Sequence, residues 1–522
     1  MLNGTPPSGP DNAGEDKVIR YLQIVIYLQI SSFFYRNRNL LRRFYHISEK
    51  ILLFFLILIM VLTLGYPNLD LNLPTEKLSS ATLSGDNIIS TSNNSIGIQQ
   101  VSNAKNGIEV NDPSLEIQLI ARGLKNPSNM AFLGPDDILV LEKNDGTVRR
   151  IVNGTMLPEP VLDTAVANLV ERGMLGIAIA RPNDASGGGA GSGPTYVFLY
   201  YTESASDGSD AEAGAAPLGN RLYRYEFVDG KLINPKLLLD FDASRGASHN
   251  GGKVLIGPDN NIYLIVGDIA GHKTLTQNYQ NNSQLTESSV IFRITQDGQS
   301  AGSILSRAEP ANKFYAYGIR NGFGMDFDPV TGKLWDTENG PNYGDEINLV
   351  EPGFNSGWAA VSGLSDLAGK VDPEQDLVTC LYCINSAGFI DDWVNEYLFG
   401  IQKGVYSEPE FTWMNVVGPT AIKFFNSDKL GKQYENDIFV GDIIWGRIYH
   451  FELNQNRDAL ALNGTLSDKV ANSYEELDPL IFAQGFRGIT DIDVGPDGYL
   501  YFLSYYSDPA IYRIVPKGTQ SP

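Results

Sequence analysis

The feature that most constrains the fold is a strand–turn–strand unit that recurs along the chain from about residue 115. In each copy an apolar strand is followed by a turn of Gly, Pro or Asp, a second strand and then a third. Apolar side chains that alternate with a period of two and stop at turn residues predict β-strands. Six copies can be recognised, and the clearest are NMAFLGPDDILVLE, GKVLIGPDNNIYLIVGD, GMDFDPVTGKLWDTEN and DIDVGPDGYLYFLSYY.

A three- or four-stranded meander cannot bury both of its faces alone. Six such units stacked around an axis cover one another and form a propeller. We therefore predict an all-β fold with a six-bladed β-propeller over residues 113–518. A pair of β-sandwiches is the alternative architecture, and six copies of one motif favour the propeller. A hydrophobic content of 43% and 53 glycines suit a folded, turn-rich β protein.

The N-terminal part has a different composition. ILLFFLILIMVLTLGY, residues 51–66, contains no charged residue and as a helix would cross most of the hydrocarbon layer of a membrane. Basic residues precede this stretch and acidic residues follow it, so the positive-inside rule predicts a cytoplasmic segment at 1–50 and everything after the anchor outside the cell. A cleaved signal peptide is the competing interpretation. Residues 67–112 are rich in Asn, Ser, Thr and Gly, which predicts a flexible linker. The whole chain is thus expected to be a single-pass protein of the cell membrane.

Charge and cysteine content limit the classes of partner. The chain has a formal net charge of −22, which argues against nucleic acid as a ligand because binding would require neutralising phosphates. Cys380 and Cys383 form a single CxxC pair. Outside the cytosol, a local disulfide and two unreacted thiols both remain open for this pair.

Polar residues recur at matching ends of the predicted strands. Loops at one end of a propeller channel converge, so these residues are expected to line one cavity. They are Glu171, His249, Asp268, Arg320, Asn321 and the stretch Glu338–Pro341. Singly, each has an ordinary explanation: His249 could bond a loop carbonyl, Arg320 could form a surface ion pair, and Asp268 could cap a turn. Together they predict a polar pocket that contains a base, a cation and carbonyl oxygens.

Several linked motifs resemble the soluble quinoprotein glucose dehydrogenase (glucose/sorbosone dehydrogenase) family over about residues 115–516. They are GMLGIAIARP, SHNGGKVLIGPDNNIYLIVGD, YAYGIRNGFGMDFDPVTGKLWDTENGPNYGDEINLVEPGFNSGWA and ITDIDVGPDGYLYFL. The resemblance implies a six-bladed propeller that oxidises the anomeric carbon of aldose sugars to lactones. It also implies pyrroloquinoline quinone (PQQ) as cofactor, Ca²⁺ beside it, and an external electron acceptor.

The resemblance also implies a role for individual residues. His249 would be the general base and Arg320 a catalytic cation on the quinone oxygens, Asp268 would lie beside the sugar, and the carbonyls of Gly340 and Pro341 would bind calcium. The positions implied in cofactor binding are Glu171, Arg320, Asn321, Asn339, Trp413 and Arg487.

The chain departs from the family at the cations that meet the three PQQ carboxylates. Ile444 stands where a lysine is expected, and Gly488 and Thr490 stand where an arginine pair is expected. These differences leave an alternative open, a non-catalytic surface propeller that binds a glycan or a protein. A calcium-dependent lactonase-like hydrolase is a third possibility, since other six-bladed propellers hold a central metal.

Overall fold

The computed structural model describes residues 107–181, 193–205, 216–269, 278, 285–358, 361–364 and 404–520. The predicted cytoplasmic segment 1–50, the anchor 51–66, most of the linker 67–112 and both cysteines lie outside the described residues. Within those ranges, no helix has the length and apolar character needed to cross a membrane.

The described residues form six β-sheets, which we number in chain order of their innermost strands. The first sheet contains β3 (Pro127–Gly134), β4 (Asp137–Glu142), β5 (Thr147–Val152), β6 (Thr155–Met156) and β7 (Leu162–Asp163). The second contains β8 (Met174–Ala180), β9 (Thr195–Ser204), β10 (Pro217–Val228) and β11 (Lys231–Phe241). The third contains β12 (Val254–Ile256), β13 (Ile262–Val266), β14 (Val290–Ile294), β15 (Phe314–Tyr317), β19 (Phe354–Asn355) and β20 (Val405–Tyr406).

The other three sheets follow the same plan. The fourth contains β16 (Gly322–Phe327), β17 (Leu334–Glu338), β18 (Asp345–Val350), β21 (Phe411–Trp413) and β25 (Val470–Ala471). The fifth contains β22 (Pro419–Phe424), β23 (Ile438–Asp442), β24 (Ile448–Phe451), β26 (Ile481–Gln484) and β1 (Glu109–Val110). The sixth contains β27 (Ile489–Val494), β28 (Leu500–Ser504), β29 (Ala510–Pro516) and β2 (Leu115–Arg122). Short 3₁₀ helices are η2 (Ala311–Lys313), η5 (Lys432–Tyr434), η6 (Gly464–Asp468) and η7 (Glu475–Leu480).

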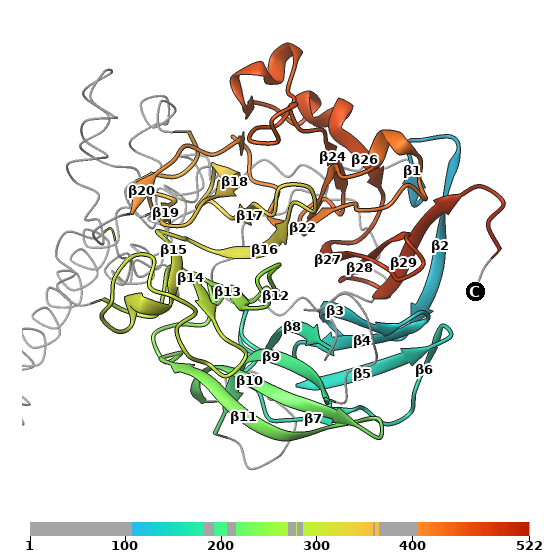
Figure 1. Ribbon diagram of the computed structural model, residues 1–522. Helices are drawn as coiled ribbons and strands as arrows, with labels where there is room; N and C mark the ends of the chain where they lie inside the picture. Colours follow the sequence, from blue (N-terminus) through green and yellow to red (C-terminus); the bar gives the residue numbers. More distant parts are fainter. Residues whose placement is uncertain are drawn as a thin grey trace, which may run out of the picture. The chain divides into compact units, whose positions relative to one another are not determined.

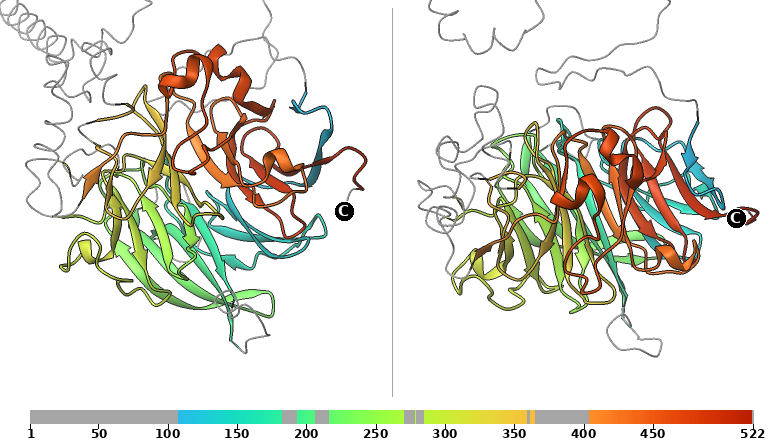
Figure 2. Two further views of the ribbon diagram at one scale, coloured as in Figure 1. Left: turned by 45° about the horizontal axis from the view of Figure 1, so that its top comes forward. Right: turned by 90° about the horizontal axis from the view of Figure 1, so that it is seen from above.

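The sheets stand around one axis, and their innermost strands are β3, β8, β12, β16, β22 and β27 (Figure 1). Each inner strand contacts the next around the ring: β3 contacts β8, β8 contacts β12, β12 contacts β16, β16 contacts β22, β22 contacts β27, and β27 contacts β3. The early strand β2 pairs with the last strand β29, so the sixth sheet combines strands from near both ends of the described chain. The prediction of an all-β propeller is confirmed. Figure 2 shows the ring from two further directions.

One predicted boundary is wrong. β1 lies inside the stretch assigned to the linker, yet Glu109 and Val110 pair with Gln484 and Ala483 of β26. The side-chain amide of Asn111 also donates to the carbonyl of Ile481 at 2.7 Å. A strand of two residues is too short to show an alternating period, which is why the sequence pattern missed it.

Apolar side chains pack between neighbouring sheets, as the alternating pattern predicts. Between the second and third sheets, for example, Phe198 and Tyr200 of β9 belong to one buried cluster with Leu264 of β13 and Phe292 of β14. Such packing covers the faces that no single sheet could bury, so each sheet depends on its neighbours for stability.

Ion pairs link inner strands, one across the axis and two between neighbours. Lys253, next to β12, binds Asp491 of the opposite inner strand β27 at 2.6 Å, and both side chains are buried. Lys423 of β22 binds Asp326 of β16 at 3.4 Å and Asp493 of β27 at 3.0 Å. The ring is therefore tied across its centre, which fixes the ends of the inner strands relative to one another.

Candidate active site

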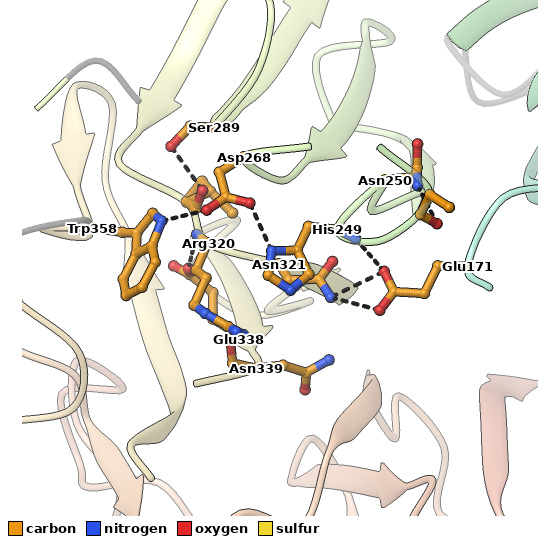
Figure 3. Close-up of polar contacts among 12 residues, drawn as sticks. Glu171, His249, Asn250, Asp268, Ser289, Arg320, Asn321, Glu338, Asn339 and Trp358 are labelled. Carbon is orange, nitrogen blue, oxygen red and sulfur yellow. Dashed lines mark hydrogen bonds and ion pairs between the residues drawn. The ribbon is translucent and has the colours of Figure 1, made fainter. Parts of the chain in front are cut away.

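One end of the ring carries the predicted polar residues. The inner strand and the second strand of each sheet are antiparallel, so the residues before an inner strand and those after the second strand lie at the same end. Glu171, His249 and Arg320 precede β8, β12 and β16, while Asp268 and Asn339 follow β13 and β17. Figure 3 shows these side chains, with Asn321 and Glu338, gathered in one place.

His249 is held by contacts to two carboxylates. Its Nδ1 lies 2.6 Å from Oδ1 of Asp268, and its backbone N–H donates to Oε2 of Glu171 at 2.5 Å. We assign the ring proton to Nδ1, because the carboxylate of Asp268 accepts it, and this leaves the basic lone pair on Nε2. His249 has φ of 60°, in the left-handed region that is unfavourable for a side chain of this size. Such a conformation persists where neighbours enforce it and is concentrated at functional sites.

Part of that enforcement comes from the next residue, Asn250. Its side-chain amide donates to the carbonyl of Ala247 at 3.0 Å, and its side-chain oxygen accepts from Asn220 at 3.0 Å. Its own carbonyl accepts from the hydroxyl of Tyr200 at 3.0 Å. These buried bonds lock the loop on which His249 stands.

Asp268 binds the ring of His249 and the indole of Trp358. The residue is fully buried, and its Oδ2 accepts the indole N–H of Trp358 at 2.7 Å. The place of Asp268 beside the sugar stays a prediction. Trp358 was not among the predicted site residues. It lies in the motif GFNSGWA, but the sequence gives no sign that its indole reaches a carboxylate 90 residues away.

Arg320 brings a fixed cation to the site. Its Nη1 donates to the carbonyls of Asn339 at 2.6 Å and Gly340 at 2.8 Å, and its guanidinium lies 5.2 Å from the ring centroid of Trp358. Burial lowers the pKa of Arg320, but a guanidinium stays protonated in proteins. Its buried Nε has no hydrogen-bond partner among the described residues. The cation thus has a donor left for a ligand.

The carboxyl group of Glu338 lies behind Arg320. Its Oε2 accepts the backbone N–H of Arg320 at 2.8 Å. Burial, followed by the neighbouring charge of Asp336, raises the pKa of Glu338 to about 8. Glu338 is therefore mostly protonated at neutral pH, and it does not neutralise the positive charge of Arg320.

Glu171 and Asn321 join the second, third and fourth sheets. The amide of Asn321 donates to Oε2 of Glu171 at 3.2 Å, and this oxygen also accepts from His249. The buried side-chain oxygens of Asn321 and Asn339 have no partner within the part of the chain that is described. Buried acceptors are rarely left unpaired, so these oxygens indicate a place for a polar ligand or for water.

A small pocket lies beside Arg320. Glu338, Asn339, Gly340 and Trp358 line it together with residues of the following loops. Pro341 follows Gly340 and is half-buried, next to the exposed Asn342. The loop after β17 therefore carries both predicted calcium-binding carbonyls, although that of Gly340 already accepts a bond from Arg320.

Trp413 and Arg487, two further predicted cofactor contacts, lie in different surroundings. Trp413 is fully buried in the apolar cluster of the fourth and fifth sheets, 4.8 Å from the ring of Phe411. A role in the pocket wall does not agree with this position, and Trp358 is the tryptophan that the structure brings to the site. Arg487 precedes β27 and is exposed at the site end of the ring.

The departures from the family cluster on the fifth and sixth sheets. Ile444 is 37% exposed, and the hydroxyl of Thr490 donates to the carbonyl of Pro127 at 2.8 Å. Gly488 has φ of 74°, and a Cβ there would lie 3.0 Å from the ring of Tyr506. The nearby cation is Arg447, whose guanidinium lies 5.6 Å from the ring centroid of Trp445 and whose buried Nη1 lacks a partner among the described residues. The three departing residues thus bring no charge to this side of the site end, where Arg447 and Arg487 are the cations.

Fold and site together define a class of protein: a β-propeller with an oriented imidazole, a buried supporting carboxylate and a fixed cation at one end of the ring. Residues 124–377 match the family model described as glucose/sorbosone dehydrogenase. This part of the chain, which carries most of the site, is therefore similar to the glucose/sorbosone dehydrogenase family.

Individual relatives agree with this assignment. Aldose sugar dehydrogenase YliI of Escherichia coli is 24% identical over 409 residues, covering 77% of this chain and 94% of that protein. Quinoprotein glucose dehydrogenase B of Acinetobacter calcoaceticus is 28% identical over 274 residues, covering 48% of this chain and 54% of that protein. Among solved structures, the PQQ-bound form of aldose sugar dehydrogenase from Streptomyces coelicolor aligns with a TM-score of 0.52 and 20% identity, covering 77% of this chain and 99% of that one.

Proposed function

We propose that this protein is a PQQ-dependent aldose sugar dehydrogenase that oxidises the anomeric carbon of a sugar to the lactone. The observation that carries the proposal is the pair formed by His249 and Asp268, next to the guanidinium of Arg320. The names of the relatives support the same activity.

The residues of the site fit the reacting end of a polar, planar cofactor. Arg320 offers its unpaired Nε, and Asn321 and Asn339 offer buried oxygens that lack partners in the described chain. PQQ bound there would supply the acceptor for the hydride that leaves the sugar. Arg320 and Asn321 would hold its quinone oxygens, and the exposed Arg487 and the partly free Arg447 are the cations available for its carboxylates.

The chain's own residues would handle the proton. Nε2 of His249 would take the proton of the anomeric hydroxyl, since its lone pair faces away from Asp268. The sugar loses this proton from the hydroxyl oxygen and a hydride from the anomeric carbon. The C–O bond between these two atoms becomes the carbonyl of the lactone. Asp268 would stabilise the imidazolium, and the positive charge of Arg320 would stabilise negative charge that develops next to it.

Calcium would bind to the carbonyls of Gly340 and Pro341, because oxygen ligands suit this hard cation. The carbonyl of Gly340 now accepts a bond from Arg320, so calcium and guanidinium would compete for it or share it. Calcium would add positive charge near the reacting end of the cofactor.

Finer features of the architecture belong to the same proposal. The six sheets would be the six blades of one propeller, and residues 51–66 would anchor it with the N-terminus in the cytoplasm and the propeller outside the cell. The uncharged stretch 51–66 and the basic residues before it support the anchor. An external acceptor would then reoxidise the cofactor.

Reconstitution tests the proposed activity. The full-length chain, purified in detergent, is titrated with PQQ and Ca²⁺ and assayed for dye-linked oxidation of a panel of aldoses. We expect bound quinone absorbance and lactone formation only when both additions are present. The absence of both bound quinone and dye reduction at micromolar PQQ would contradict the proposal.

The absence of a charge at Ile444 and Gly488 favours one alternative, a surface propeller that binds a glycan or a protein without catalysis. Glycan binding that persists unchanged in a His249→Ala variant, in a protein that takes up no quinone, would support this alternative.

A further inference from the structure

Lys143 is a buried lysine that the mechanism above does not use. It follows β4, and its ammonium donates to the carbonyl of Val170 at 3.0 Å and to that of Arg172 at 2.9 Å. These residues stand on either side of Glu171. The ammonium of Lys143 therefore binds the residues on both sides of Glu171, which itself contacts His249 and Asn321.

Burial alone would not hold the loop 169–173 in this conformation. Val170, a β-branched residue, has φ of 57° and is 57% exposed, and Leu169 beside it is also exposed. A left-handed conformation is costly for such a residue and persists only where surrounding contacts impose it. The bonds from Lys143 are contacts of this kind.

Lys143 and the loop 169–173 approach each other closely. Gly173 has φ of 137°, and a Cβ there would lie 2.2 Å from the carbonyl oxygen of Lys143. That same carbonyl accepts the N–H of Met174 at 2.9 Å. The segment that follows Glu171 is thus bound to Lys143 through its main chain, at Met174, as well as through its side chain, at Arg172.

Placing an ammonium here has an energetic cost, which indicates a function. Burial lowers the pKa of Lys143 to about 8, and the attraction of Glu171 acts against this shift. A surface lysine would avoid the desolvation cost, so the charge at this position is compensated by what it binds.

We propose that Lys143 is a positioning residue of the site, which fixes loop 169–173 so that the carboxylate of Glu171 stays on the backbone N–H of His249 and the amide of Asn321. The geometric part of this inference concerns the protein without cofactor. Its kinetic part rests on the proposed function.

Hydrogen–deuterium exchange of the full-length chain without cofactor tests the geometric part. In Lys143→Met, which keeps the length of the side chain and removes the charge, we expect the N–H of His249 to exchange at least about tenfold faster. Lys125→Met is the matched control: Lys125 pairs with Asp145 at 3.0 Å in the same sheet, is exposed, and loses the same charge. Its exchange at His249 should equal that of the wild type.

Two exchange results would overturn the inference. One is unchanged exchange at His249 in Lys143→Met. The other is faster exchange across all six sheets, since that would make Lys143 a general stability residue; a Lys143→Met chain that does not fold counts as this second result. Lys143→Arg, which keeps the charge, should restore at least part of the protection at His249.

A double-mutant cycle on kcat/KM tests the kinetic part. If Lys143 acts through Glu171, Lys143→Met should lower kcat/KM by about tenfold or more in the wild type, but by less than about threefold in a Glu171→Ala background. Effects that multiply independently would contradict the inference. If no form of the protein oxidises a sugar, the proposed function has failed, and the exchange measurement still decides the role of Lys143.

Discussion

Replacing Asp268 by Asn changes one carboxylate oxygen to an amide NH₂ group. The volume of the side chain stays nearly the same. In the wild type, Oδ1 of Asp268 accepts the Nδ1–H of His249 at 2.6 Å, and Oδ2 accepts the indole N–H of Trp358 at 2.7 Å. In the variant the oxygen keeps the bond to Trp358, so the amide NH₂ faces Nδ1 of His249. Nδ1 must then accept, and the ring proton moves to Nε2, the atom that has to be basic.

The expected loss has two parts. A hydrogen bond to a charged group contributes about 1.5–3 kcal/mol, so losing the support of the imidazolium lowers kcat by roughly 10- to 150-fold. The unfavourable tautomer adds to this, and the same change in a serine-protease triad costs about 10⁴-fold. We therefore expect kcat to fall by about 10³- to 10⁴-fold while KM changes little.

The assay is dye-linked sugar oxidation at saturating PQQ and Ca²⁺, with circular dichroism to verify the fold. Asp437→Asn is the matched control, because Asp437 binds Nε2 of His450 at 2.8 Å in the fifth sheet, away from the site. Its kcat should stay near that of the wild type. A kcat for Asp268→Asn within about threefold of the wild type, or an equal loss in Asp437→Asn, would refute the orientation of His249 described above.

Three further predictions concern Arg320, Glu338 and Trp413. Arg320→Met frees the carbonyl of Gly340 and removes a nearby positive charge, so the cofactor-free chain should bind Ca²⁺ about tenfold or more tightly by isothermal titration calorimetry, while turnover falls. Glu338 has a pKa of about 8 in the folded state, above its ordinary value of 4.5, so its contribution to stability is lost as pH rises from about 4.5 to 8. Glu338→Gln should therefore gain about 1 kcal/mol or more in free energy of unfolding relative to the wild type between pH 5 and pH 8, measured by urea denaturation. Trp413→Ala should lower the free energy of unfolding by about 3–5 kcal/mol, with kcat within about threefold of the wild type where the variant is folded.

Each of these has a clear contrary result. Weaker calcium binding in Arg320→Met would mean that Arg320 supports the calcium carbonyls instead of competing for them. A difference between Glu338→Gln and the wild type that does not change with pH would show that Glu338 is ionised throughout. A large loss of kcat in a fully stable Trp413→Ala would restore Trp413 to the site.

Local patterns in the sequence predicted most of the ring. Alternation along GKVLIGPDNNIYLIV and a turn at Gly-Pro-Asp are properties of neighbouring residues, and β12 and β13 form where the pattern places them. The two residues of β1 carry no such pattern, because their strand exists only through pairing with β26, more than 370 residues later.

The sequence predicts which residues gather at the site only to the extent that it predicts where strands begin and end. His249 and Arg320 stand where the inner strands begin, so their convergence follows from the ring. Which side chain meets which depends on contacts across sheets: Trp358 reaches Asp268, and Lys143 reaches the loop of Glu171. In sequence Lys143 reads as an ordinary turn lysine in LEKNDG, and nothing local distinguishes it.

The central claim is that His249 acts as the base in a site that binds the cofactor through other residues. Its most direct test compares quinone binding and turnover in the same preparations of the wild type and of His249→Gln, with PQQ and Ca²⁺ added to the full chain. We predict equal quinone uptake by absorbance and a turnover lowered at least about 10³-fold in the variant. Turnover close to that of the wild type at equal quinone content would contradict the account.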